Sequence, residues 1–326
     1  VNSRGIKEGK RVQNAFTSGK FLLLLLFILF GLIFAANSGA IQANLKYFWE
    51  PQQHLKDQPA LSLSGIGLIA ALGMAMVGSL FSSDAWNNIT FTAGEVINPK
   101  KNIPLSLFLG TFFVTILYLL ANTVYLMVLP LRGDPAGTTV IDQGMQFAAN
   151  DRLGTAVISQ VFGSSAAVIM AVFIVISTFG CNNGLILAGA RVYYAMSIDG
   201  LFFKKAGELN KNGVPSRGLL LQCIWASLLC LSGTYGQLLD YVVFAVLIFY
   251  VLTIAGIFIL RKKQPDVERP YKAFGYPVIP ALYIMLASAV MIILLIFKQD
   301  YTWPGLVIVI MGIPVFFLWK KKGSKQ

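Results

Sequence analysis

Long apolar blocks separated by short polar segments run along most of this chain of 326 residues. A helix of roughly 20 apolar residues crosses a bilayer core about 30 Å thick, and several blocks reach that length. The pattern therefore predicts an all-α membrane protein. Its eight predicted crossings are 19–37, 61–97, 103–129, 162–190, 217–233, 237–260, 278–297 and 302–319.

The block 61–97 differs from the others because small and polar residues interrupt it. Phe81-Ser82-Ser83-Asp84-Ala85 falls where the bilayer midplane should lie. A broken helix frees backbone groups, and irregular backbone at membrane depth persists only against protein or a water-filled cavity. Free carbonyls attract an ammonium and free N–H groups attract a carboxylate. The interruption therefore predicts a substrate site that can offer partners to an ammonium group and to a carboxylate group.

Composition and charge agree with a protein embedded in a lipid bilayer. Hydrophobic residues make up 56% of the chain and charged residues 12%, more apolar material than a soluble core can bury. One predicted face carries 21 of the 26 Lys and Arg residues. The positive-inside rule thus predicts that both termini lie in the cytoplasm, and we expect a multi-pass protein of the plasma (inner) membrane. Because these basic residues are scattered over short loops, we expect no nucleic-acid partner.

Metal, disulfide and enzyme chemistry have little support in the sequence. Cys181, Cys223 and Cys230 all fall inside predicted spans, and the lone His54 has no second ligand nearby. No span pairs an acid with a base or a nucleophile with an activating neighbour. We therefore expect no cofactor, no metal site and no enzymatic activity.

Six motifs together carry a family resemblance: RVQNAFTSGK (11–20), FSSDAWNN (81–88), GEVINPKKNIP (94–104), STFGCNNG (177–184), ARVYYAMSIDGLFF (190–203) and RPYKAFGYPVIP (269–280). In this order they resemble the amino acid/polyamine/organocation superfamily, in particular the L-type amino acid transporters and their bacterial relatives. The resemblance implies a twelve-helix, inverted-repeat (LeuT-like) fold, of which this chain is a fragment running from helix 5 to helix 12. We expect that the first four helices, and half of the substrate site with them, lie outside this sequence.

The resemblance also implies an assignment for each block and a function. The blocks become helix 5 (19–37), broken helix 6 (61–97), helix 7 (103–129), an extracellular loop (130–161), helix 8 (162–190), a cytoplasmic loop helix (191–216), helix 9 (217–233), helix 10 (237–260), helix 11 (278–297) and helix 12 (302–319). The implied function is secondary amino acid transport by alternating access, as sodium-independent exchange or uniport of neutral amino acids. The sequence specifies neither which amino acid is carried nor the oligomeric state.

By resemblance, the substrate would bind at the break in helix 6. Phe81 matches an aromatic gate, carbonyls around Ser82, Ser83 and Asp84 would receive the substrate amine, and Asn87 matches a polar position in the pocket. The alternative is that Phe81 and the nearby Trp86 only pack against neighbouring helices.

Asp84 has two interpretations, because an ionisable residue near the midplane is costly and therefore a functional candidate. Its carboxylate could pair directly with a cationic substrate. It could instead accept backbone N–H bonds and cap a second half-helix from Ala85 to Ile97. We favour the cap, which leaves a neutral substrate as the better prediction.

Lys20 precedes an uninterrupted apolar run, so it could be an interfacial lysine that extends its amine to the cytoplasm. By resemblance, it is instead a buried amine that occupies the place of a sodium ion and links helix 5 to helix 8. Its helix 8 partners would be Ser177 and Cys181, which share a helix face at i, i+4. Alternatively, these small residues serve helix packing together with Gly180 and Gly184.

Glu95 lies just before Asn98-Pro99-Lys100-Lys101, where the proline is expected to end the half-helix. It could form an inner gate with a base such as Arg191, or be a solvated carboxylate.

Two other functions stay open beside neutral amino acid transport. One is proton-coupled or cationic amino acid or polyamine transport, and the other is a nontransporting component of a membrane assembly.

Overall fold

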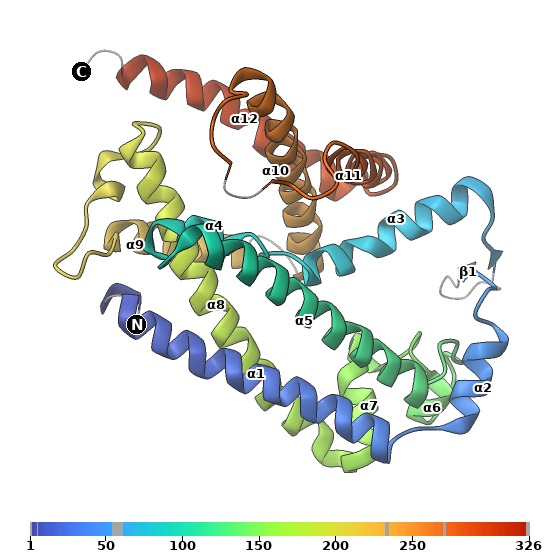
Figure 1. Ribbon diagram of the computed structural model, residues 1–326. Coiled ribbons are helices and arrows are strands. Elements are labelled where there is room, and N and C mark those ends of the chain that lie inside the picture. Colours follow the sequence, from blue (N-terminus) through green and yellow to red (C-terminus); the bar gives the residue numbers. More distant parts are fainter. Residues whose placement is uncertain (1, 5, 54–60, 232–234, 270–271, 324–326) are drawn as a thin grey trace. The chain divides into compact units, whose positions relative to one another are not determined.

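The chain is almost entirely helical in the computed structural model, which describes residues 2–4, 6–53, 61–231, 235–269 and 272–323 (Figure 1). The all-α prediction is confirmed, with one small exception: β1 (Gln52–Gln53) and β2 (Leu61–Ser62) pair as a two-stranded sheet. Each predicted block contains a helix. These are α1 (Ile6–Phe34), α3 (Gly65–Ser82), α5 (Pro99–Val128), α8 (Ala166–Ile198), α9 (Ser216–Cys230), α10 (Tyr235–Lys263), α11 (Val278–Phe297) and α12 (Gln299–Gly323).

Six helical segments of the described chain are long and apolar enough to cross a membrane. Two further apolar helices, Ser216–Cys230 and Thr302–Phe317, are shorter. Large apolar side chains remain exposed along these helices; Ile33 and Leu119, for example, are 66% and 64% exposed. Such surfaces would be costly in water but are favourable against lipid tails.

Several helix ends differ from the predicted spans. Helix α1 begins at Ile6 rather than near position 19, because the polar segment before the apolar run is itself helical. Helix α8 continues beyond position 190 to Ile198, and only the short 3-10 helix η5 (Lys204–Gly207) follows it in the predicted cytoplasmic loop.

The predicted extracellular loop 130–161 is more ordered than its polar sequence suggested. It contains α6 (Val140–Gln143), whose first turn is closed by a capping box between Thr139 and Asp142. It also contains most of α7 (Leu153–Phe162), which buries Val157 and Ile158.

The chain divides into two compact units. The first comprises 1–52, 108–188 and 210–214, and the second comprises 53–107, 189–209 and 215–326. In the first unit, apolar side chains of α1, α5 and α7 form the core, including Phe27, Ile28, Leu117, Val124, Val128, Val157 and Ile158.

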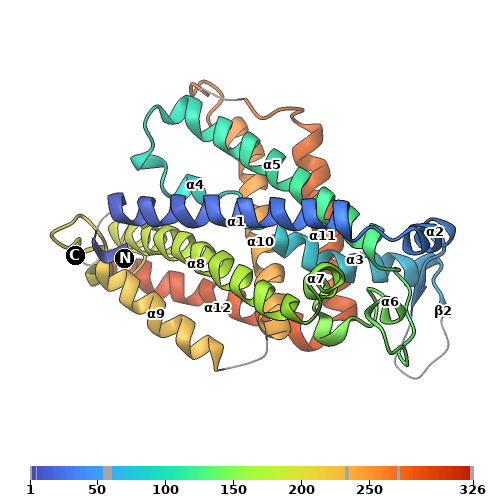
Figure 2. The same cartoon turned by 90° about the horizontal axis from the view of Figure 1, so that it is seen from below.

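Helices α1 and α8 lie side by side in this first unit (Figures 1 and 2). Small residues allow the close approach: a Cβ built on Gly180 would lie 2.7 Å from the Phe16 Cβ. One turn along α8, the buried Asn183 amide donates to Gln13 Oε1 at 2.9 Å and to the Gly9 carbonyl at 3.3 Å. Glycine contacts and a satisfied amide are typical devices of helix pairing in membranes, where the hydrophobic effect contributes little.

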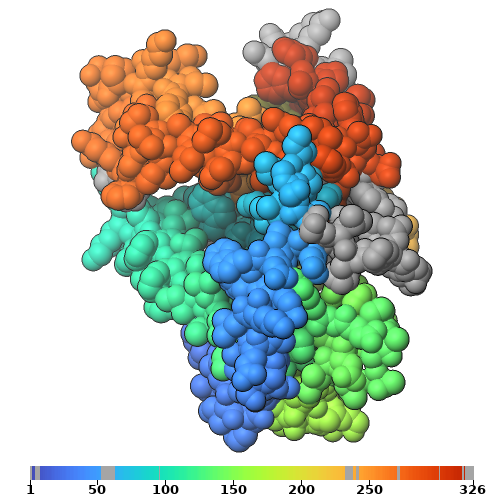
Figure 3. Space-filling view, turned by 90° about the vertical axis from the view of Figure 1, so that its right-hand side faces the viewer, coloured from blue at the N-terminus to red at the C-terminus, as the bar shows by residue number. Residues whose placement is uncertain are grey.

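The core of the second unit is built from α3, α10 and α11. Val77 of α3 packs with Phe244 and Leu247 of α10 and with Ala287 and Val290 of α11. Gly73 again permits the approach, because a Cβ there would lie 2.7 Å from Ile293. Figure 3 shows the α3 segment, in cyan, against the orange segment of α11. This core fixes the end of α3, where the chain is interrupted.

We predict that Gly180→Ala lowers the melting temperature of the purified protein, since the added methyl group would overlap Phe16. Overpacking of this kind costs about 1–3 kcal/mol. Gly110→Ala on α5 is the matched control, because a Cβ at Gly110 meets no atom within 4 Å among the described residues. Equal melting temperatures for the two variants in a thermal unfolding assay would contradict the proposed α1–α8 contact.

Candidate functional site

The predicted interruption is present: α3 ends at Ser82, and residues 83–87 form turns. Ser82 and Ser83 donate their hydroxyl groups back to the carbonyls of Gly78 and Ser79, at 2.8 and 2.9 Å. Short hydroxyl side chains of this kind compete with the helical ladder and favour its end. Ala85 then adopts φ of 64°, a left-handed conformation that is rare for a residue with a Cβ.

The interruption leaves backbone groups of both kinds available. Among the backbone hydrogen bonds of the described residues, none uses the carbonyls of Ser83 and Asp84 or the N–H groups of Trp86 and Asn87. The Phe81 carbonyl, by contrast, already accepts the Asp84 N–H at 3.1 Å. The segment can therefore offer acceptors to an ammonium group and donors to a carboxylate.

The prediction of a second half-helix from Ala85 to Ile97 is wrong. The chain forms only α4 (Asn88–Phe91) and the 3-10 helix η2 (Ala93–Glu95). Thr90 and Thr92 each donate a hydroxyl to a carbonyl three residues earlier, which competes with a regular helix. Pro99 does not end a helix but begins α5, a position where its missing N–H costs nothing.

The capping role favoured for Asp84 is also not what the structure shows. Asn87 stands at the N-cap of α4 and makes no side-chain cap hydrogen bond. The Asp84 carboxylate instead accepts the hydroxyl of Tyr250 on α10, with 2.5 Å between Oδ1 and the phenolic oxygen. The same hydroxyl lies 3.3 Å from Asn87 Oδ1. The carboxylate thus has a side-chain donor rather than a helix terminus as its partner.

The aromatic residues at the break differ in their surroundings. Trp86 packs against Tyr250, with 5.6 Å between ring centroids, so for Trp86 the packing interpretation holds. Phe81 is 38% exposed at the last turn of α3. Its role as a gate stays a prediction, as does that of Glu95, whose side chain lies outside the described part of the chain.

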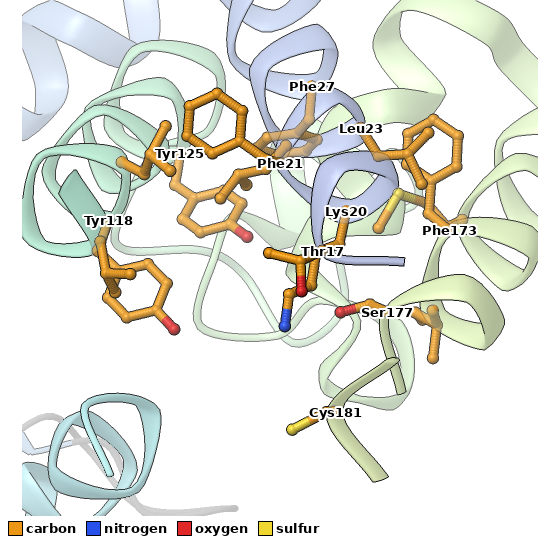
Figure 4. Close-up of a pocket in the computed structure, with 15 residues that line it drawn as sticks. Thr17, Lys20, Phe21, Leu23, Phe27, Tyr118, Tyr125, Phe173, Ser177 and Cys181 are labelled. Atoms are coloured by element: carbon orange, nitrogen blue, oxygen red, sulfur yellow. The ribbon is translucent and has the colours of Figure 1, made fainter. Parts of the chain in front are cut away.

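A second group of predicted residues meets in one cavity of about 510 Å³ inside the first unit. Lys20 comes from α1, and Ser177 and Cys181 come from α8 (Figure 4). The Lys20 amine and the Ser177 hydroxyl face the same space, and the Cys181 thiol lies along it. Because α1 begins at Ile6 and ends at Phe34, Lys20 is the central residue of that helix and does not lie at either end.

Sequence reasoning missed four residues of these two groups. Thr17, Tyr118 and Tyr125 also line the cavity, and Tyr250 contacts Asp84. Thr17 could have been found, because it lies one turn before Lys20 on the same helix face. Tyr250 sits within an apolar block and has no local signal, because only the packing of α3 with α10 brings it to the break.

Known proteins share sequence similarity with almost the whole of this chain. The amino acid permease family matches residues 1–317. The chain is 28% identical over 331 residues to the large neutral amino acids transporter small subunit 2 of Homo sapiens, covering 99% of this chain and 56% of the relative. It is 27% identical over 341 residues to the b(0,+)-type amino acid transporter 1 of Homo sapiens, covering 100% of this chain and 62% of the relative. The chain thus spans less than two thirds of the length of these curated relatives.

We predict that Ala85→Gly is tolerated whereas Ala85→Val destabilises the protein. Glycine adopts positive φ freely, while a Cβ in the left-handed region costs about 1–2 kcal/mol and β-branching adds to this. Thermal unfolding of the purified variants tests the difference. Equal losses for glycine and valine would show that the left-handed turn at position 85 is not part of the folded state.

Proposed function

The chain belongs to the amino acid permease family, and from this premise we propose that its protein is a secondary transporter that carries amino acids by alternating access. The chain is part of a multi-pass integral membrane protein, as its long apolar helices indicate. Its helices are consistent with part of the inverted-repeat transporter fold expected from the motifs.

The single observation that carries the proposal is the unwound segment 83–87. It presents carbonyls and N–H groups that have no backbone partner among the described residues, within a few residues of each other. Every amino acid carries an ammonium and a carboxylate close together, so such a segment can bind the part that all amino acids share. Phe81, Ser82, Ser83, Asp84 and Asn87 are the residues proposed to contact the substrate.

Lys20 supports sodium-independent transport of neutral amino acids. The Lys20 amine lines the same cavity as Ser177 and Cys181, and an amine at this position could hold α1 to α8 without a bound metal ion. The central position of Lys20 in α1 argues against a terminal lysine that reaches out to the membrane surface.

A second candidate, transport of cationic amino acids, is favoured by Asp84. Its carboxylate makes no hydrogen bond to a helix N-terminus among the described residues, so it does not serve as a helix cap. A half-buried carboxylate beside the unwound segment could pair with a substrate cation, or change protonation during proton-coupled transport.

For localisation, we propose the plasma (inner) membrane with both termini in the cytoplasm. The orientation rests on the concentration of Lys and Arg in alternate loops, which the positive-inside rule assigns to the cytoplasmic side.

Uptake by the full-length protein in liposomes tests the function. We expect saturable uptake of a labelled neutral amino acid that is unchanged when sodium is replaced by choline. Stimulation by preloaded amino acid would identify exchange, and dependence on a pH gradient would identify proton coupling. The absence of saturable uptake of both neutral and cationic amino acids would reject transport in favour of a nontransporting membrane component.

We further predict that Lys20→Met reduces uptake at least about tenfold, since losing a charged partner inside a protein costs roughly 1.5–3 kcal/mol. Lys46→Met is the matched control: that lysine contacts the Tyr47 ring at the end of α2 (Ser38–Lys46), and its loss should leave uptake unchanged. Full activity of the Lys20 variant would remove the amine from the mechanism.

A further inference from the structure

We propose that Tyr250 of α10 is a specificity-determining residue. Its hydroxyl holds the Asp84 carboxylate at the break of α3 and thereby limits how strongly a cationic amino acid is preferred over a neutral one. This inference rests on the proposed transport function. Tyr250 lies far from the break in the sequence and belongs to none of the six family motifs.

The hydrogen bond itself is of the strong type. A hydroxyl that donates to a carboxylate forms a short, charge-assisted bond, and the 2.5 Å separation is at the short end of that range. The hydroxyl has one proton and two acceptors in reach, Asp84 Oδ1 at 2.5 Å and Asn87 Oδ1 at 3.3 Å. The proton therefore goes to the carboxylate, and Asn87 is the weaker contact.

The surrounding packing holds Tyr250 in place. Val243, Leu247 and Tyr250 fall at i, i+4 and i+7 on one face of α10, and the first two are buried in the core shared with α3 and α11. Trp86 covers the tyrosine ring from the unwound segment. The hydroxyl is thus placed by a packed core, while its acceptor lies on irregular backbone that has few bonds of its own.

The hydrogen bond from Tyr250 to Asp84 should affect which substrates are preferred. A carboxylate that already accepts a strong hydrogen bond gains less from a nearby ammonium or guanidinium than one without a donor, because the donor has partly stabilised its charge. Neutral substrates do not use the carboxylate in this way. Removal of the hydroxyl should therefore favour cationic substrates selectively and also loosen the segment that Tyr250 holds.

The experiment compares Tyr250→Phe, Asp84→Ala and the double variant in the full-length protein. In liposomes, Tyr250→Phe should raise the ratio of lysine to leucine apparent affinity by roughly tenfold, the loss expected for a hydrogen bond to a charged group. In the Asp84→Ala background, the same change should have no further effect on the ratio, because the two residues act as a pair. Tyr193→Phe removes a hydroxyl from α8 in the same unit and should leave the ratio unchanged.

Backbone hydrogen exchange of residues 82–88 gives a second readout that needs no transport. Tyr250→Phe should accelerate exchange there as much as Asp84→Ala does, with no added effect in the double variant. An unchanged exchange rate or an unchanged affinity ratio in Tyr250→Phe would overturn the inference. If the wild-type protein shows no uptake at all, the proposed function fails, whereas the exchange rates still decide whether Tyr250 holds Asp84.

Discussion

Backbone polar groups inside a membrane must find partners, and in the described part of the chain the segment 83–87 has carbonyls and N–H groups without a backbone partner. Elsewhere the long helices satisfy their own N–H and C=O groups. At the break, two serine hydroxyls donate back to carbonyls near the end of α3, while two carbonyls and two N–H groups further along have no backbone partner among the described residues. A ligand with both charges can complete this arrangement, which is why a binding function fits this segment better than a structural one.

Close helix packing makes the break possible. In the second unit, Gly73 lets α3 approach α11 and the shared core with α10 fixes the end of α3. In the first unit, Gly180 and the buried Asn183 amide set α1 against α8. Where lipid replaces water, van der Waals contact and satisfied amides hold helices together, and so small residues and a few polar groups define the position of both candidate groups.

Asp84 illustrates how a local rule can fail. An aspartate before a helical segment is ordinarily a good cap, and this made the cap the natural interpretation. The following segment, however, is too rich in threonine and asparagine to form a long helix, so there is little terminus to cap. The carboxylate instead accepts a hydrogen bond from Tyr250 of another helix. Asp84 is therefore a candidate for substrate selection and not a helix cap.

The sequence by itself determined the helical membrane class, the place of the break and the shared helix face of Ser177 and Cys181, while the family resemblance predicted that Lys20 lies near these two residues. Apolar length, an interrupted block and i, i+4 spacing are local patterns, and motifs in a fixed order carry family information. Three features were decided only in the folded structure, by competition between local hydrogen bonds and by packing. They are the short helices after the break, the start of α1 at Ile6 and the hydrogen bond between Tyr250 and Asp84. Tyr250 and Asp84 are 166 residues apart in the chain. No local pattern reports such a contact, because only the folding of α3 against α10 brings the two side chains together.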